Sequence, residues 1–189
     1  MNPNEIVLKV IRALDQVQIP YMVVGSFSSN VYGVERNTKD VDLVLQLEAQ
    51  AVAPLVSALG PDFSFDPQLG FETVTMTQRY IASHRDPTFK VELFMLSDDP
   101  HDQERFRRRV AGRITDHPVY IASAEDVVIT KLRWSKQGRR SKDVQDVLGV
   151  LSVQQGRLDL PYIRHWCSAH GTLELFEKTL ASIPPLPAN

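Results

Sequence analysis

Two short apolar segments near the start of the chain predict a pair of buried strands. The segment YMVV (21–24) is apolar throughout, and DVDLVL (40–45) is apolar after its two aspartates. Gly25 and Ser26 interrupt the first strand, and the residues after them can restart as a helix. Residues 5–17 place apolar side chains at helical spacing, which predicts an amphipathic helix ahead of the first strand.

The rest of the chain divides into a β-rich block and a helical block that meet near residue 123. In the first block we expect helices at 47–59 and 101–109, a loop at 60–70, and strands at 71–76, 79–83, 89–96 and 119–123. Ser123 and Asp126 fit a capping box, which begins the helical block. We therefore predict an α+β fold: a small mixed β-sheet flanked by helices in residues 1–123, followed by a helical part in residues 124–189.

The composition is that of a globular protein, with 43% apolar residues in 189 and a formal net charge of −2. The single cysteine, Cys167, has no partner for an internal disulfide, which is typical of a reducing compartment. We find no signal-peptide pattern and no apolar run of the roughly 20 residues that span a bilayer. We therefore expect a cytoplasmic protein with no membrane partner. Its bulk charge neither favours nor excludes a nucleic acid.

The aspartates at the start of the second strand predict a metal site. Asp40 and Asp42 are two residues apart, so their side chains point to the same face of a strand. Two carboxylates this close repel each other unless a cation lies between them, and Mg²⁺ prefers such oxygen ligands. Alternatively, Asp40 caps a turn and Asp42 is simply solvated.

The Gly25–Ser26 pair between the first strand and the next helix predicts a phosphate site. Glycine lets the backbone turn tightly, and the N-terminus of a helix offers N–H groups to an anion. The Ser26 hydroxyl can donate to a phosphate oxygen. Alternatively, Ser26 or Ser28 only caps the helix.

These two features together carry a family resemblance. The segment GSFSSNVYGVERNTKDVDLVL (25–45) resembles the signature of the DNA-polymerase-β-like nucleotidyltransferase superfamily. Arg36 and Thr38 fall in the register of that signature, as do Asp40 and Asp42. The resemblance implies Mg²⁺, an NTP substrate bound in part by Arg36 and Thr38, and a third carboxylate on a neighbouring strand.

Glu92 is the candidate for that third carboxylate. In FKVELFML (89–96) it is the lone acid of an otherwise apolar strand, so it needs a partner such as a metal ion beside Asp40 and Asp42. We therefore assign Asp40, Asp42 and Glu92 as catalytic residues and metal ligands. The alternative is that Glu92 pairs with Lys90 or Arg79 on a solvated face.

The helical block carries a second resemblance. The segment SAEDVVITKLRWSKQGRRSKDVQDVL is similar to the second half of small bacterial nucleotidyltransferases, including those of abortive-infection and toxin–antitoxin systems. The resemblance implies that Lys131 contacts the triphosphate, that Asp143 orients groups of the active site, and that this block completes the active-site cleft. Asp143 and Asp146 share a helix face at i, i+3 spacing. Alternatively, Lys131 snorkels to solvent and Asp143 complements the helix dipole.

These observations favour a metal-dependent nucleotidyltransferase that moves a nucleotide from an NTP to an acceptor hydroxyl and releases pyrophosphate. The acceptor stays open between RNA, a protein side chain and a small molecule. The alternative is a non-catalytic nucleotide-binding or interaction module, with a partner protein, such as one half of a toxin–antitoxin pair. A P-loop NTPase and a zinc site are excluded because their motifs are missing.

Overall fold

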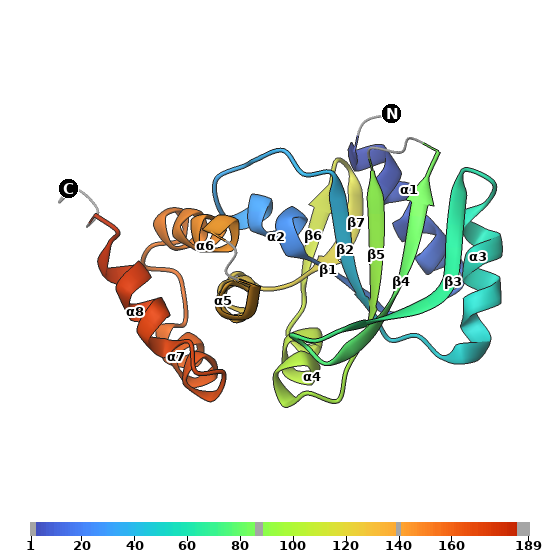
Figure 1. Ribbon diagram of the computed structural model, residues 1–189. Helices are drawn as coiled ribbons and strands as arrows, with labels where there is room; N and C mark the ends of the chain where they lie inside the picture. Colours follow the sequence, from blue (N-terminus) through green and yellow to red (C-terminus); the bar gives the residue numbers. More distant parts are fainter. Residues whose placement is uncertain (1–2, 86–88, 139–140, 185–189) are drawn as a thin grey trace. The chain divides into compact units, whose positions relative to one another are not determined.

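A seven-stranded mixed sheet and eight α-helices make up the described part of the chain (Figure 1). The computed structural model describes residues 3–85, 89–138 and 141–184. The strands are β1 (Tyr21–Val24), β2 (Asp40–Leu45), β3 (Phe63–Glu72), β4 (Thr77–His84), β5 (Lys90–Met95), β6 (Val110–Ile114) and β7 (His117–Ile121). The helices are α1 (Pro3–Gln16), α2 (Gly25–Tyr32), α3 (Val52–Leu59), α4 (Pro100–Arg107), α5 (Ala124–Gly138), α6 (Ser141–Val153), α7 (Leu160–Ala169) and α8 (Leu173–Ala181), with a short 3₁₀ turn, η1 (Ala49–Ala51), before α3.

The strand order in the sheet is β3-β4-β5-β2-β1-β7-β6. Strand β2 runs parallel to β5 and antiparallel to β1, while β1 runs parallel to β7. The outer pairs, β3 with β4, β4 with β5, and β6 with β7, are antiparallel. This confirms the α+β prediction of a mixed sheet with helices. The expected strands at 21–24, 40–45 and 89–96 correspond to β1, β2 and β5, which lie in one sheet.

Alternation along the two central strands separates a buried face from a polar face. Val41 and Leu43 of β2 are fully buried, as are Val91 and Leu93 of β5. The residues between them point the other way, because successive side chains of a strand alternate. Helix α1 also buries an apolar stripe and contacts α3.

Contacts divide the chain into two compact units. The sheet unit comprises residues 1–24 and 37–122, and the helical unit comprises residues 25–36 and 123–189. The change from sheet to helices falls at residues 122–123, next to the expected boundary. Residues 25–36, which the sequence placed in the first part, pack with the helices instead.

Close approach of two backbones joins α2 to α6 within the helical unit. A Cβ atom at Gly33 would lie 2.9 Å from the Val150 nitrogen and 3.0 Å from the Gly149 carbonyl carbon. Both neighbours are backbone atoms, so only a residue without a side chain fits at Gly33.

Among the described residues, no helix is both long and apolar enough to cross a membrane.

The beginning of α5 confirms the predicted capping box. The Asp126 backbone N–H donates to the Ser123 hydroxyl at 3.2 Å, and that hydroxyl donates to the Asp126 carboxylate at 2.8 Å. Both residues are buried, so the cap also satisfies polar groups that lie away from water.

Two local predictions were wrong. Residues 60–70 were expected to be a loop, but β3 begins at Phe63 and pairs with β4, with an irregular register between Asp66 and Gly70. Strand β3 is at the edge of the sheet, where a proline such as Pro67 costs no ladder bond on its open side. The segment 71–76 was expected to be a strand, but residues 73–76 form the turn between β3 and β4. Strand β6, which pairs with β7, was not predicted.

Candidate active site

Three carboxylates of the sheet unit point to one face of adjacent strands. Asp42 of β2 is the register partner of Glu92 of β5, and Asp40 is the register partner of Lys90. Because register partners on neighbouring strands point the same way, Asp40, Asp42 and Glu92 share a face with Lys90. All four side chains are of intermediate exposure rather than buried. This face therefore gathers oxygen ligands at a solvent-accessible position.

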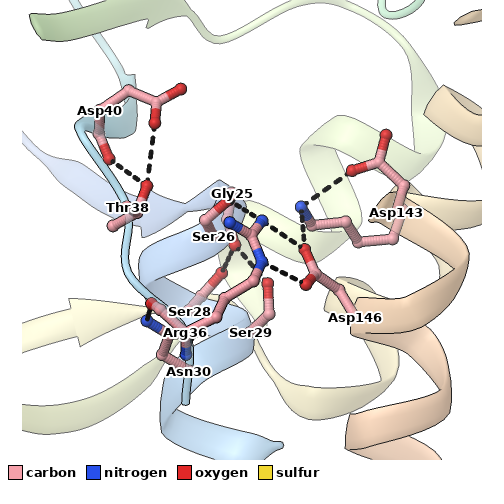
Figure 2. A network of polar contacts seen from close by, with 11 residues as sticks. Gly25, Ser26, Ser28, Ser29, Asn30, Arg36, Thr38, Asp40, Asp143 and Asp146 are labelled. Atoms are coloured by element: carbon pink, nitrogen blue, oxygen red, sulfur yellow. Dashed lines mark hydrogen bonds and ion pairs between the residues drawn. The ribbon is translucent and has the colours of Figure 1, made fainter. Parts of the chain in front are cut away.

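Thr38 fixes the position of the first aspartate. Its hydroxyl lies 2.9 Å from Asp40 Oδ1 and 3.1 Å from the Asp40 carbonyl oxygen (Figure 2). A single hydroxyl proton serves one of these acceptors at a time. Thr38, expected to bind nucleotide, thus contacts a carboxylate that was expected to hold the metal.

Glu92 is already paired with two cations. Lys90 Nζ lies 2.5 Å from Glu92 Oε1, and Arg79 Nη1 lies 3.6 Å from Glu92 Oε2. Both partners named in the alternative interpretation are therefore present. Across the described ranges, no group of three His, Cys, Asp or Glu side chains is arranged to hold a metal ion. The role of Glu92 as a third metal ligand stays a prediction.

The first residues of α2 follow directly from β1 and have an unusual backbone. Gly25 has a φ of +66°, in the region that favours glycine. Its carbonyl oxygen accepts hydrogen bonds from the hydroxyls of Ser28 at 3.0 Å and Ser29 at 2.8 Å. Both serines are buried and use their hydroxyl protons within their own helix. The sequence could not tell the three serines apart, but their hydrogen bonds do.

Arg36 connects the start of α2 to α6. Its Nε donates to Asp146 Oδ1 at 2.7 Å, and its Nη2 donates to Asp146 Oδ2 at 2.9 Å and to Ser26 Oγ at 2.6 Å (Figure 2). Asn30 holds the backbone at the same place, because its side chain donates to the Arg36 carbonyl and accepts from the Arg36 N–H. The two-pronged bond to a carboxylate is the geometry that guanidinium favours.

Lys131 lies between two aspartates of α6. Its Nζ is 3.0 Å from Asp143 Oδ1 and 2.7 Å from Asp146 Oδ2. Lys131 and Asp143 keep only 8% and 2% of their surface exposed, so neither is a solvated side chain. The second oxygen of Asp143, Oδ2, is buried and has no hydrogen-bond partner among the described residues.

The charges of these four residues balance. Arg36 and Lys131 contribute two positive charges, and Asp143 and Asp146 contribute two negative charges. Burial raises the pKa of Asp146, but hydrogen bonds and charge from Arg36 and Lys131 outweigh burial and leave that pKa below its ordinary value. Asp146 is therefore ionised throughout the physiological range.

The expected nucleotide-binding residues fall into two groups. Thr38 lies in the sheet unit beside Asp40, and the helical unit holds the others, which are Gly25, Ser26, Arg36, Lys131 and Asp143. Within the helical unit the structure links Ser26, Arg36, Lys131 and Asp143 through Asp146. Asp146 was not among the selected residues, although its i, i+3 spacing from Asp143 was a signal that could have identified it.

Comparisons with known proteins identify the fold. No family model and no curated protein matches this sequence. The crystal structure of ANT(2″)-Ia in complex with adenylyl-2″-tobramycin is similar with a TM-score of 0.63 at 14% identity, covering 89% of this chain and 97% of that one. The solution structure of ANT(2″)-Ia, described as an antibiotic-resistance factor, gives a TM-score of 0.61 at 15% identity, covering 93% and 96%.

A further solved structure supports the same conclusion. An antigenic nucleotidyltransferase-like protein from Paracoccidioides brasiliensis is similar with a TM-score of 0.56 at 17% identity, covering 94% of this chain and 92% of that one. The chain therefore has the nucleotidyltransferase fold, as the motif in residues 25–45 predicted. The narrower resemblance to toxin–antitoxin proteins stays a prediction.

Proposed function

We propose that this protein is a Mg²⁺-dependent nucleotidyltransferase. One observation carries the proposal. Asp42 and Glu92 are register partners on adjacent parallel strands of a nucleotidyltransferase fold, and Asp40 lies two residues before Asp42 on the same face. In the proposed reaction an acceptor hydroxyl oxygen attacks the α-phosphorus of an NTP. The bond from that phosphorus to the oxygen that bridges to the β-phosphate breaks, and pyrophosphate leaves.

Asp40 and Asp42 have the chemistry that the metal requires. Mg²⁺ commonly binds one or two carboxylates and completes its shell with water and phosphate oxygens, so two aspartates on one strand suffice. Thr38 restrains Asp40 by the hydrogen bond to Oδ1, which lowers the entropy lost when a ligand binds. The ion, when bound, neutralises charge on the phosphates.

Glu92 is the residue that we propose to act beside this pair, either as a further ligand or as the base for the acceptor proton. In the base role, its carboxylate takes the proton that the attacking hydroxyl loses. Its bond to Lys90 is no obstacle, because the Lys90 side chain is 45% exposed and such ion pairs contribute little. Arg79 at 3.6 Å is a looser partner.

We propose that the triphosphate binds at the start of α2. The first N–H groups of a helix have no partner within the helix, so they and the Ser26 hydroxyl can both donate to an anion. We retain Lys131 and Asp143 as candidates for nucleotide contact. Both residues adjoin Arg36 and Ser26 through Asp146, which is the observation that supports keeping them as candidates.

The acceptor class that we test first is a small molecule with a hydroxyl group. ANT(2″)-Ia, whose fold this chain shares, was crystallised with adenylyl-2″-tobramycin. RNA ends and protein side chains are the other two acceptors. The arginine run that begins at Arg105 gives RNA no special support, since Arg105 is buried against Asp102 at 2.8 Å and Arg107 pairs with Glu104 at 2.6 Å.

The decisive experiment follows the label of the nucleotide. The purified protein is incubated with Mg²⁺, a cell extract or tobramycin, and each of the four NTPs labelled at the α- or the γ-phosphate. Transfer predicts that α-label enters an acceptor while γ-label leaves in pyrophosphate, and that Asp42→Asn abolishes both. Release of γ-label as inorganic phosphate alone would indicate hydrolysis and contradict the proposal.

One observation favours a second function, a non-catalytic nucleotide-binding module of the same fold. Both oxygens of Glu92 already face cations, as they would in a site that needs no third ligand. This alternative predicts NTP binding by the wild-type protein with no transfer of α-label to any acceptor.

A further inference from the structure

The three serines at the start of α2 use their hydroxyl groups differently. Ser28 and Ser29 each donate to the Gly25 carbonyl oxygen. Ser26 instead accepts, because Arg36 Nη2 donates to its Oγ at 2.6 Å. A hydroxyl has one proton and two lone pairs, so a serine that accepts from a guanidinium keeps its proton for another acceptor.

The Arg36 guanidinium, which makes the Ser26 hydroxyl an acceptor, is itself held in place. Two N–H groups of Arg36 bind the two oxygens of Asp146, at 2.7 and 2.9 Å, and this fixes the plane of the fork. The Asp146 side chain is 5% exposed, and Lys131 contacts its Oδ2 at 2.7 Å from the other side. A series of hydrogen bonds therefore connects the rigid Asp146 carboxylate, through Arg36, to the Ser26 hydroxyl at the start of α2.

We propose that Asp146 is a positioning residue for the triphosphate, acting through Arg36 to orient the Ser26 hydroxyl as a donor to a phosphate oxygen. The inference rests on the proposed function and assigns a role to a residue that touches no phosphate. It also explains why two cations in the cluster come with two aspartates. The four charges cancel, so these residues give the anion no net electrostatic attraction. Their contribution is to direct the Ser26 hydroxyl proton toward a phosphate oxygen.

The cluster favours this role over one of plain charge attraction. If Arg36 bound a phosphate in place of Asp146, the buried Asp146 carboxylate would lose its two-pronged partner and keep only Lys131, which is unfavourable. Donation from Ser26 leaves every bond of the cluster intact. Asn30 binds the Arg36 backbone at both its N–H and its carbonyl, which further restricts its movement.

The test is a double-mutant cycle that uses inorganic tripolyphosphate with Mg²⁺ as the probe, because this anion is common to all NTPs. Calorimetry gives the Kd for wild type, Ser26→Ala, Asp146→Asn and the double variant. We expect each single change to weaken binding about tenfold, the scale of one hydrogen bond to a charged group. The double variant should also be about tenfold weaker, not about a hundredfold, because both changes remove the same oriented proton.

A matched control separates positioning from loss of structure. Asp126 is a fully buried carboxylate of the same unit that accepts from the hydroxyls of Ser123 and Tyr162. We expect both Asp126→Asn and Asp146→Asn to lower the melting temperature, and only Asp146→Asn to raise the Kd. An equal rise of Kd in both variants would overturn the inference.

A conservative change covers the case in which Asp146→Asn does not fold. Arg36→Lys keeps the charge, and its side chain is 34% exposed, but an ammonium cannot hold Asp146 with two bonds and reach Ser26 as well. We expect about tenfold weaker binding from Arg36→Lys in the wild-type background and no further loss in the Ser26→Ala background. Additive losses in this cycle would overturn the positioning role alone. Failure of folded wild type to bind the probe would instead overturn the proposed function, and the inference with it.

Discussion

Asp42 and Glu92 occupy the same register position on two adjacent parallel strands, β2 and β5, so their carboxylates point to one face of the sheet. They are 50 positions apart in the sequence, and only the pairing of the strands brings them together. Glu92 faces the Lys90 ammonium at 2.5 Å and the Arg79 guanidinium at 3.6 Å. These cations reduce the repulsion that neighbouring carboxylates would otherwise cause. The consequences for stability and activity can be measured.

The first prediction concerns the stability of an Asp42→Asn variant. Asp40 and Asp42 point the same way, so removing one charge relieves repulsion in the absence of metal. Without Mg²⁺ the variant should melt at the same temperature as wild type or slightly higher. With Mg²⁺ and NTP, wild type should gain about 2 to 3 kcal/mol at a ligand concentration near 100 times its Kd, and the variant much less. Melting curves with and without the ligands measure both effects.

An apo variant clearly less stable than apo wild type would contradict this prediction. That result would mean that the contacts of Asp42 with the rest of the protein outweigh its repulsion from Asp40, and the non-catalytic alternative would then be preferred. Activity of the variant in the label-transfer assay should fall by orders of magnitude, because metal stabilisation of the transition state is lost.

The second prediction concerns Glu92→Gln. If Glu92 accepts the proton of the attacking hydroxyl, kcat should fall by about 10² to 10⁴ while the KM for NTP changes little. The control is Glu177→Gln, which removes the charge from an exposed pair with Arg164 and should leave kcat and stability close to those of wild type. Normal turnover by the Glu92 variant would contradict a catalytic role, and Glu92 would then serve only to pair with Lys90 and Arg79.

The third prediction is the pH dependence that comes from Asp146. Its pKa in the folded protein lies below the ordinary value of 3.8, because Arg36 and Lys131 outweigh the effect of burial. The unfolded chain therefore takes up a proton first as the pH falls. The stabilisation is fully present above pH 3.8 and is lost as the pH falls through the folded pKa.

The measurement is the melting temperature of wild type and Asp146→Asn between neutral pH and strong acid. Wild type should be the more stable at neutral pH, and the difference should shrink below pH 3.8. A difference that stays constant into acid would show that the ionised form of Asp146 does not stabilise the fold.

The fourth prediction concerns Cys167 in the helical unit. Burial raises the pKa of its thiol to about 11, and the residue has no exposed surface. Only the thiolate reacts, so iodoacetamide at pH 8 should leave the native protein unlabelled and should label it fully in denaturant. Mass spectrometry after timed exposure gives the rate. Rapid labelling of the native protein would show that the helices α7 and α8 open readily.

The fifth prediction tests the close approach of α2 and α6. Gly33→Ala places a Cβ atom 2.9 Å from the Val150 nitrogen, which forces the two backbones apart. The cost should be about 1 to 3 kcal/mol in unfolding free energy, the usual range for overpacking. Gly70→Ala is the control, because its nearest neighbour would be a side-chain atom of Arg79 at an ordinary 3.6 Å. Denaturant titration of both variants should separate them clearly.

Local sequence patterns predicted most of the elements because each pattern has a local cause. The apolar period of residues 5–17 corresponds to α1, and the apolar runs at 21–24 and 40–45 correspond to β1 and β2. The capping box at Ser123 works through bonds between residues three apart. Strand β3 was missed because its residues, at a sheet edge, become a strand only by pairing with β4.

The sequence by itself determined that two carboxylates share one face of a strand and that a glycine–serine turn precedes a helix. Alternation of side chains and the conformational freedom of glycine are local properties, and they need no knowledge of distant residues. Only the tertiary structure decided which serine accepts from Arg36, and that Asp146, 110 residues away, is the partner of that arginine. A buried ion pair depends on burial and charge balance, and neither exists until the helices have packed.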